Sequence, residues 1–221
     1  MEHATASPHA LHAGTTTGLD NRKIGIWLFL GSEVMFFSAL IGTYLLTRAG
    51  TGKPVELFRA DALWLITANT FLLIGSSLTM ALSLGLIRRG NQIGFRIALF
   101  FTILLGATFV FVQFFVEYPK LCSEGLWPGS HPVFCAGAPG IVELSGEQLQ
   151  TLRSFGSPFY LLTGFHGLHV TGGVIWNLFV WLKGLRGGFS RENNAGVEFA
   201  GLYWHFVDLV WIVLFTIIYL L

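Results

Sequence analysis

The sequence contains 221 residues, of which 53% are hydrophobic and 11% are charged, and its formal net charge is +1. This composition indicates an integral membrane protein and not a soluble domain. A net charge near zero, without a basic run, argues against binding to nucleic acid.

Residues 1–22 are polar and contain no apolar core, which predicts a disordered cytoplasmic tail and not a signal peptide. His3, His9 and His12 lie in this tail. Histidines scattered along a flexible tail are usually solvated, so we expect no metal site there.

Five apolar segments follow, and each is long enough to cross a bilayer with some tilt. They cover roughly residues 24–46, 62–87, 97–116, 159–181 and 199–221. We therefore predict an all-α, polytopic membrane protein with five transmembrane helices in a bundle. Because the number of spans is odd, the two termini should lie on opposite sides of the membrane.

Basic residues beside the spans predict the orientation, because Lys and Arg are enriched on the inside. Eight of them fall on one side of the predicted bundle and five on the other. The first side carries Arg22, Lys23, Arg88, Arg89, Arg96, Lys183, Arg186 and Arg191, and the second Arg48, Lys53, Arg59, Lys120 and Arg153. This difference predicts the N-terminus inside and the C-terminus outside.

The first span carries Glu33 among apolar residues, where a carboxyl group is energetically costly. Phe29 and Phe37 share its helix face. We expect a neutral structural acid that donates one hydrogen bond to a polar group of another span, such as His166 or His205. A role in proton handling and a contact with lipid or a partner remain open alternatives.

Asn69 begins a stripe along the second span that also contains Ser76, Met80 and Ser83. Such a stripe is typical of hydrogen bonding and close packing between helices in lipid. It does not indicate a chemical site.

The third span places Gln113 and Glu117 on one stripe with Thr102 and Gly106. Glu117 and Tyr118 come at the end of the apolar segment. We predict that they are interfacial residues at the exit to water.

A long segment rich in Pro and Gly, residues 119–154, should form an external loop and contains both cysteines, Cys122 and Cys135. Because the outer compartment is oxidising, we favour a disulfide over two free thiols. A copper or zinc site would need more ligands than these two thiolates and His131.

The fourth span carries His166, His169 and Asn177 within one sector of a helix, at membrane depth. Small residues, Gly164 and Gly167 among them, lie on a second sector where another backbone could approach. A helix with two such faces should pack between neighbouring helices.

The fifth span places Glu198, His205 and Asp208 on one face, with His205 and Asp208 at i,i+3 spacing and able to touch. With Glu33 and the two histidines of the fourth span, buried acids and bases therefore lie on three helices. They should face the bundle interior or a partner subunit. Three histidines could ligate one haem at most, and a dihaem bundle needs four, so we expect no cofactor in this chain.

Several motifs resemble subunit III of the haem-copper cytochrome oxidases, and they cover all five spans in order. They are W-L-F-L-G-S-E-V-M-F-F at 27–37, A-N-T at 68–70, T-I-L-L-G-A-T-F at 102–109, E-Y at 117–118, G-F-H-G-L-H-V at 164–170 and Y-W-H-F-V-D-L-V-W at 203–211. The chain lacks the first two helices of the seven-helix mitochondrial pattern and is similar to the five-helix bacterial form.

The resemblance implies that residues 23–221 are an accessory membrane subunit of the bacterial plasma membrane that binds catalytic subunit I. Subunit II, further subunits and membrane lipids are implied partners, with haem and copper in the partner subunits and phospholipid bound to this one. The implied function is support of subunit I stability and proton uptake during oxygen reduction coupled to proton pumping.

The S-E-V sequence around Glu33 looks more like the cytochrome c type than the quinol type of oxidase, and both donors stay open. Membership of a respiratory supercomplex is also left open. A hypothesis from another class is a stand-alone proton-coupled transporter that uses Glu33 and Asp208 as relays.

Overall fold

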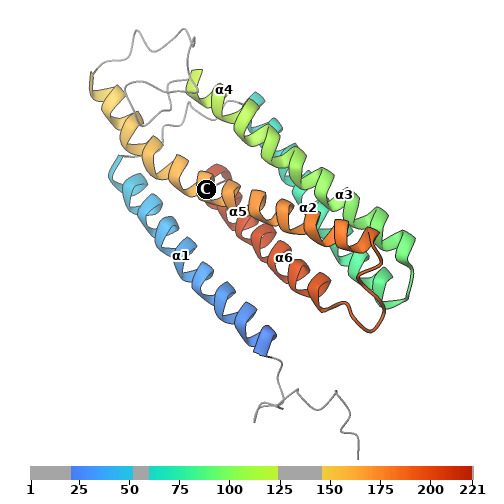
Figure 1. Ribbon diagram of the computed structural model, residues 1–221. Helices are drawn as coiled ribbons and strands as arrows, with labels where there is room; N and C mark the ends of the chain where they lie inside the picture. The colour runs from blue at the N-terminus through green and yellow to red at the C-terminus, as the bar shows by residue number, and fades with distance from the viewer. Residues whose placement is uncertain (1–20, 52–59, 124–145, 221) are drawn as a thin grey trace, which may run out of the picture.

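The computed structural model describes residues 21–51, 60–123 and 146–220 (Figure 1). Within these ranges every regular element is a helix. The elements are α1 (Asn21–Thr51), α2 (Ala60–Arg88), α3 (Gln92–Val112), the π-helical turn η1 (Gln113–Glu117), α4 (Tyr118–Ser123), α5 (Gly146–Leu185), α6 (Ala195–Phe215) and the π-helical turn η3 (Thr216–Leu220).

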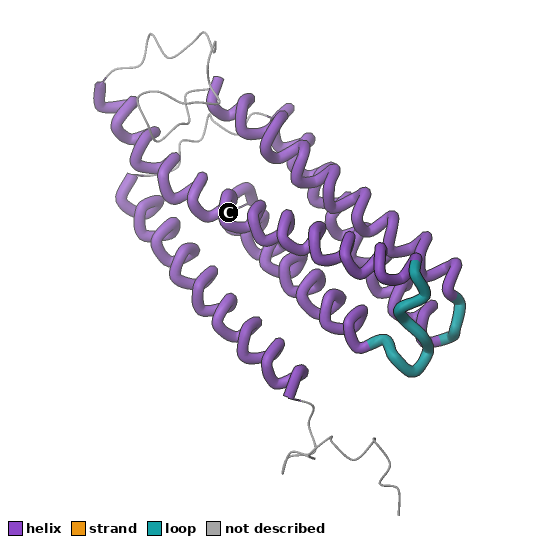
Figure 2. The backbone as a smooth tube through the Cα atoms, viewed as in Figure 1, coloured by secondary structure: helices purple, strands orange, loops and turns teal. Residues whose placement is uncertain are grey.

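Two short connections show why the helices end where they do (Figure 2). Gly90 has a φ of 81° and Gly187 a φ of 72°, a left-handed conformation that glycine adopts at little cost after a helix. Asn91 then caps α3, because its Oδ1 accepts a hydrogen bond of 2.8 Å from the backbone N–H of Gly94. Both connections lie at the same end of the bundle.

The helices α5 and α6 occupy the middle of the bundle. Figure 1 shows α1 along one side and α2 with α3 along the other. Helix α1 packs against α5 and α6, whereas α3 packs against α5 and α2 against α6. The attachment of α1 to the remainder of the bundle therefore runs through α5 and α6.

Four helices in the described ranges are long and apolar enough to span a membrane: Asn21–Gly50, Leu63–Arg88, Gln92–Leu121 and Ala195–Leu220. Helix α5 is longer still, but its middle carries His166, His169 and Asn177. Each of the five predicted segments falls on one continuous helical stretch, the third running from α3 into η1 and the fifth from α6 into η3 up to Leu220. The chain is thus a helical bundle of the multi-pass membrane type, with four to five apolar helices.

The core of the bundle is built around Trp204 of α6, which is almost fully buried. A Cβ atom on Gly106 of α3 would lie 2.5 Å from the Trp204 ring, and one on Gly173 of α5 would lie 2.8 Å from it. Two glycines thus make room for the indole. Its Nε1 donates a hydrogen bond of 3.0 Å to Ser76 Oγ of α2, which satisfies the one polar atom of the ring.

The small-residue sector of α5 receives a side chain where a backbone was expected. A Cβ atom on Gly167 would lie 3.0 Å from the ring of Phe114. An aromatic ring fills the space beside a glycine as well as a second backbone would, and the sequence pattern does not distinguish the two.

The predicted loop at 119–154 is helical at both ends, since α4 continues to Ser123 and α5 begins at Gly146. Pro119 is the second residue of α4, in the first turn of a helix, where a missing backbone N–H is tolerated. The Cys135 residue and the side chain of Cys122 lie outside the described structure, so the disulfide stays a prediction. Residues 1–20 of the predicted tail also lie outside it, whereas Asn21 and Arg22 begin α1.

Candidate functional site

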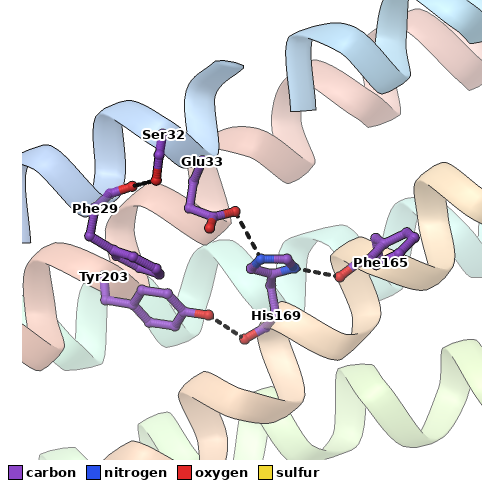
Figure 3. Close-up of polar contacts among 6 residues, drawn as sticks. All are labelled: Phe29, Ser32, Glu33, Phe165, His169 and Tyr203. Atoms are coloured by element: carbon purple, nitrogen blue, oxygen red, sulfur yellow. Dashed lines mark hydrogen bonds and ion pairs between the residues drawn. The ribbon is translucent and has the colours of Figure 1, made fainter. Parts of the chain in front are cut away.

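Glu33 of α1 and His169 of α5 form the polar contact shown in Figure 3. Glu33 Oε2 lies 3.0 Å from His169 Nε2, and the two side chains are 17% and 19% exposed. The aromatic rings of Phe36 and Phe37 lie against the imidazole. The predicted acid therefore does pair with a histidine of another helix, but that histidine is neither His166 nor His205.

The hydrogen bonds of His169 determine where its protons can be. Its Nδ1 lies 2.7 Å from the carbonyl oxygen of Phe165. A carbonyl only accepts, so Nδ1 carries a hydrogen. Two protonation states fit this geometry. In the first the imidazole is neutral, its Nε2 accepts, and a protonated Glu33 donates to it. In the second the imidazole is a cation, and its Nε2 donates to a Glu33 carboxylate. In either state one proton occupies the contact between Nε2 and Oε2.

Tyr203 of α6 completes this group, which thereby joins three helices (Figure 3). Its hydroxyl donates a hydrogen bond of 3.0 Å to the carbonyl oxygen of His169. Its ring also lies against Phe29 of α1, with a centroid distance of 6.1 Å. The helix α1 is thus held to both of its neighbours in this region.

His166 lies one turn before His169 but has a different environment. It is completely buried and stacks on Trp211, with the ring centroids 4.8 Å apart. The edge of a further ring, Phe109, also faces it. Neither ring nitrogen has a hydrogen-bond partner among the described residues. His166 is therefore an aromatic core residue and not a member of the polar pair.

His205 and Asp208 of α6 meet through a third residue, Ser77 of α2. The Ser77 hydroxyl lies 2.6 Å from His205 Nδ1 and also hydrogen-bonds Asp208. The expected pairing at i,i+3 is thus bridged by a hydroxyl. His205 is exposed on the surface of the chain, whereas Asp208 is mostly buried.

Glu117 and Tyr118, expected as interfacial residues at the exit to water, are both buried among other side chains of the chain. Tyr219 donates a hydrogen bond of 2.6 Å to Glu117 Oε1, and Tyr118 donates one of 3.0 Å to Thr163 Oγ1. The helix continues through α4, so Glu117 does not lie at its end. Gln113 lies nearby and donates from its Nε2 to the carbonyl oxygen of Thr163.

Glu198 lies at one end of the bundle, in ion pairs with two other helices. Its carboxylate oxygens are 3.0 Å from Lys23 Nζ and 3.2 Å from Arg88 Nη2. Asn69, on the predicted stripe of α2, is buried and donates to the carbonyl oxygen of Phe109. These contacts join helices and are compatible with packing between the spans.

The described residues hold no group of three or more His, Cys, Asp and Glu side chains arranged to bind a metal ion. The acids and bases that the fold brings together can hold protons and join helices.

Sequence reasoning missed Ser77, Tyr203 and Tyr219 as polar partners. The predicted stripe passed through Ser76, and the side chain of the next residue points about 100° away. Tyr203 opens the motif at 203–211 but was given no polar role there, and Tyr219 belonged to no motif, so only an unexplained hydroxyl on an apolar helix could have drawn attention to them.

Comparison with known proteins identifies one family, from a family model at the C-terminal end and from relatives matched over most of the chain. Residues 150–221 match the family model described as cytochrome c oxidase subunit III. The chain is 30% identical to quinol oxidase subunit 3 of Bacillus subtilis (strain 168), covering 96% of this chain and 97% of that protein. It is 31% identical to cytochrome c oxidase subunit 3 of Bacillus sp. (strain PS3), with 99% and 94% covered.

A third relative, the probable cytochrome c oxidase subunit 3 of Mycobacterium tuberculosis (strain ATCC 25618 / H37Rv), is 35% identical, with 89% of this chain and 86% of that protein covered. These relatives are matched over nearly their whole lengths. With the helical bundle described above, the matches show that the chain belongs to the subunit III family of the haem-copper cytochrome oxidases.

Proposed function

We propose that the chain is an accessory, cofactor-free subunit 3 of a haem-copper terminal oxidase that couples oxygen reduction to proton pumping. The observation that carries this proposal is the match over nearly full length to subunits of such oxidases. The chain binds subunit I directly, and haem and copper reside in the partner subunits, subunit II included. Its role is to support the stability of subunit I and the uptake of protons.

The proposed electron donor is cytochrome c. Relatives named for cytochrome c oxidase reach 35% identity, and the S-E-V sequence around Glu33 points to the same type. Subunit 3 of a quinol oxidase is the second candidate, favoured by a relative of that name with 97% of its length matched.

The proposed location is the bacterial plasma membrane, with the N-terminus inside. Lys23 and Arg88 lie at the same end of the bundle, because both pair with Glu198, and the count of basic residues favours this end as the inner one. Phospholipid binds along the bundle in this proposal.

The polar residues inside the bundle have a structural role in this proposal. Glu33 and His169 satisfy one another, as do Glu117 and Tyr219. A buried polar group that is hydrogen-bonded within its own chain is explained by that contact, without a role in a proton-transfer pathway. In this proposal Glu33 is the neutral partner of His169, joins α1 to α5 and is not an obligatory proton carrier.

Co-purification tests the proposal. An affinity tag on this chain should bring a haem-containing subunit out of the membrane, visible in an optical spectrum of the purified complex. Oxygen consumption with reduced cytochrome c and with a quinol then identifies the donor. Recovery of the chain without any haem protein would contradict the oxidase assignment and favour a stand-alone transporter.

A second measurement tests the absence of a redox role. A strain that lacks this chain but still assembles subunit I should keep its haem and copper centres and part of its oxygen consumption. The expected losses are in proton supply and in the working lifetime of the enzyme. Disappearance of a metal centre in that complex would contradict the cofactor-free assignment.

A further inference from the structure

The three intramembrane histidines differ in how their ring nitrogens are satisfied. Both nitrogens of His169 have partners within the chain, and those of His166 are enclosed by aromatic rings. His205 is the remaining case. Its Nδ1 is bonded to Ser77, whereas its Nε2 has no hydrogen bond among the described residues, and the side chain is exposed.

The position of His205 makes this exposure costly. The residue lies near the middle of the helix formed by Ala195–Leu220, one of the candidate membrane spans. At that depth lipid chains offer no hydrogen-bonding group, and an unsatisfied polar atom costs several kcal/mol.

Five hydroxyl groups at exposed or half-buried positions elsewhere on the bundle avoid this cost. Each of them donates to a carbonyl oxygen of its own helix, three or four residues earlier, which suits a surface that faces lipid. They are Ser32, Thr43, Thr47, Thr108 and Thr216. An imidazole bonded through Nδ1 cannot turn its Nε2 back to the same helix, so His205 needs a group from outside the chain.

The residues around His205 form a surface suited to another helix. We define the central α2–α6 face as His205 with Ser77 and the exposed side chains one or two turns away on the same two helices. These side chains are Ile74, Ala81, Leu209 and Ile212. A polar group at the centre of an apolar surface is typical of contacts between transmembrane helices.

We propose that the central α2–α6 face is a docking surface for a transmembrane helix of a partner oxidase subunit, which supplies a polar side chain to His205 Nε2. This inference rests on the proposed function. A lipid headgroup is a poorer candidate for the occupant, because headgroups lie at the two membrane surfaces and His205 lies midway between them. A protein helix carries polar side chains at any depth.

Site-specific photo-crosslinking in the intact complex tests the contact. A benzophenone amino acid replaces Leu209, which lies one turn from His205 and leaves the imidazole in place. The matched control replaces Met35, which is also strongly exposed but lies on α1, on the other side of the bundle (Figure 1). Illumination should join the Leu209 variant to a second oxidase subunit, well above the Met35 background.

The outcomes separate this inference from the proposed function. A complex that co-purifies normally, but in which the Leu209 probe gives only lipid adducts or no product, overturns the docking surface and leaves the subunit assignment intact. If the wild-type chain co-purifies with no haem protein, both the docking surface and the subunit assignment are contradicted.

Substitution of His205 tests the hydrogen bond itself. His205→Phe keeps the ring but loses Nε2, and we expect retention of this chain in the complex to fall about tenfold, the factor for loss of one buried hydrogen bond. His205→Gln keeps a polar group and should retain more of the partner. Thermal unfolding of the isolated subunits shows whether each variant is folded. Equal retention of a folded His205→Phe chain and the wild type would overturn the proposal.

Discussion

The bundle contains two regions that solve the problem of packing in lipid differently. The core around Trp204 relies on shape, with two glycines that admit an indole. The interface between α1 and α5 relies on a polar pair, Glu33 and His169. Only 11% of the α1 span is buried within the chain, against 50% of the α6 span. A helix with little buried surface gains specificity from a hydrogen bond, whereas a central helix gains it from close packing.

The largest expected effect comes from filling the space beside Trp204. Gly106→Ala would place a methyl group 2.5 Å from the indole, and we expect a loss of about 1–3 kcal/mol in unfolding free energy because the ring must move. Unfolding in mixed detergent micelles measures this loss.

The control for that substitution lies on α1. A Cβ atom on Gly31 would meet nothing within 4 Å, so Gly31→Ala should be neutral, or stabilising by up to ~1 kcal/mol through helix propensity. Equal losses in the two variants would contradict the distinction between a closely packed core and a loosely packed α1.

The second effect comes from breaking the polar pair. Glu33→Leu leaves His169 Nε2 without a partner, and we expect a cost of about 1–3 kcal/mol. Glu33→Gln should cost less, because its amide N–H can donate to the same nitrogen. Infrared spectroscopy offers a second readout, since the carbonyl band of a protonated acid should vanish in both variants. Its absence from the wild type would contradict a proton on Glu33.

His166, one turn before His169 on α5, tests the difference between a residue held by packing and one held by a polar pair. Substitution of His166 by Phe removes two nitrogens that have no hydrogen bonds in the described structure and keeps a ring against Trp211. We expect a stability within about 1 kcal/mol of the wild type, or slightly above it, since no polar group is then buried unpaired. His169→Phe should behave like Glu33→Leu. A greater loss for His166 than for His169 would reverse our assignment of the two residues.

The smallest expected effect lies at the end of the bundle. Glu198→Gln weakens the ion pairs to Lys23 and Arg88, which are partly exposed to solvent. Such pairs contribute roughly 0–1 kcal/mol and are screened by salt. Unfolding measured at low and high salt should show a difference between wild type and variant only at low salt. A loss that persists at high salt would indicate a buried role for Glu198.

Local patterns in the sequence determined the helical class and the five apolar segments. Runs such as 24–46 and 97–116 need no partner to identify them, because apolar length alone satisfies the membrane. The need of Glu33 for a polar partner followed from the same reasoning, since a lone carboxyl in hydrocarbon is costly. The motifs around His166 and His205 were sufficient to suggest the family, and the relatives then showed that the chain belongs to it.

The tertiary structure decided which polar groups meet. Periodicity placed His166 and His169 on one face of α5. The neighbours of each ring come from other helices, and the sequence of α5 does not determine how those helices are rotated about their own axes. Glu117 was expected at the exit to water, and it is buried because α4 continues the helix and Tyr219 arrives from the end of the chain. Contacts between residues more than a hundred positions apart depend on the packing of the whole bundle.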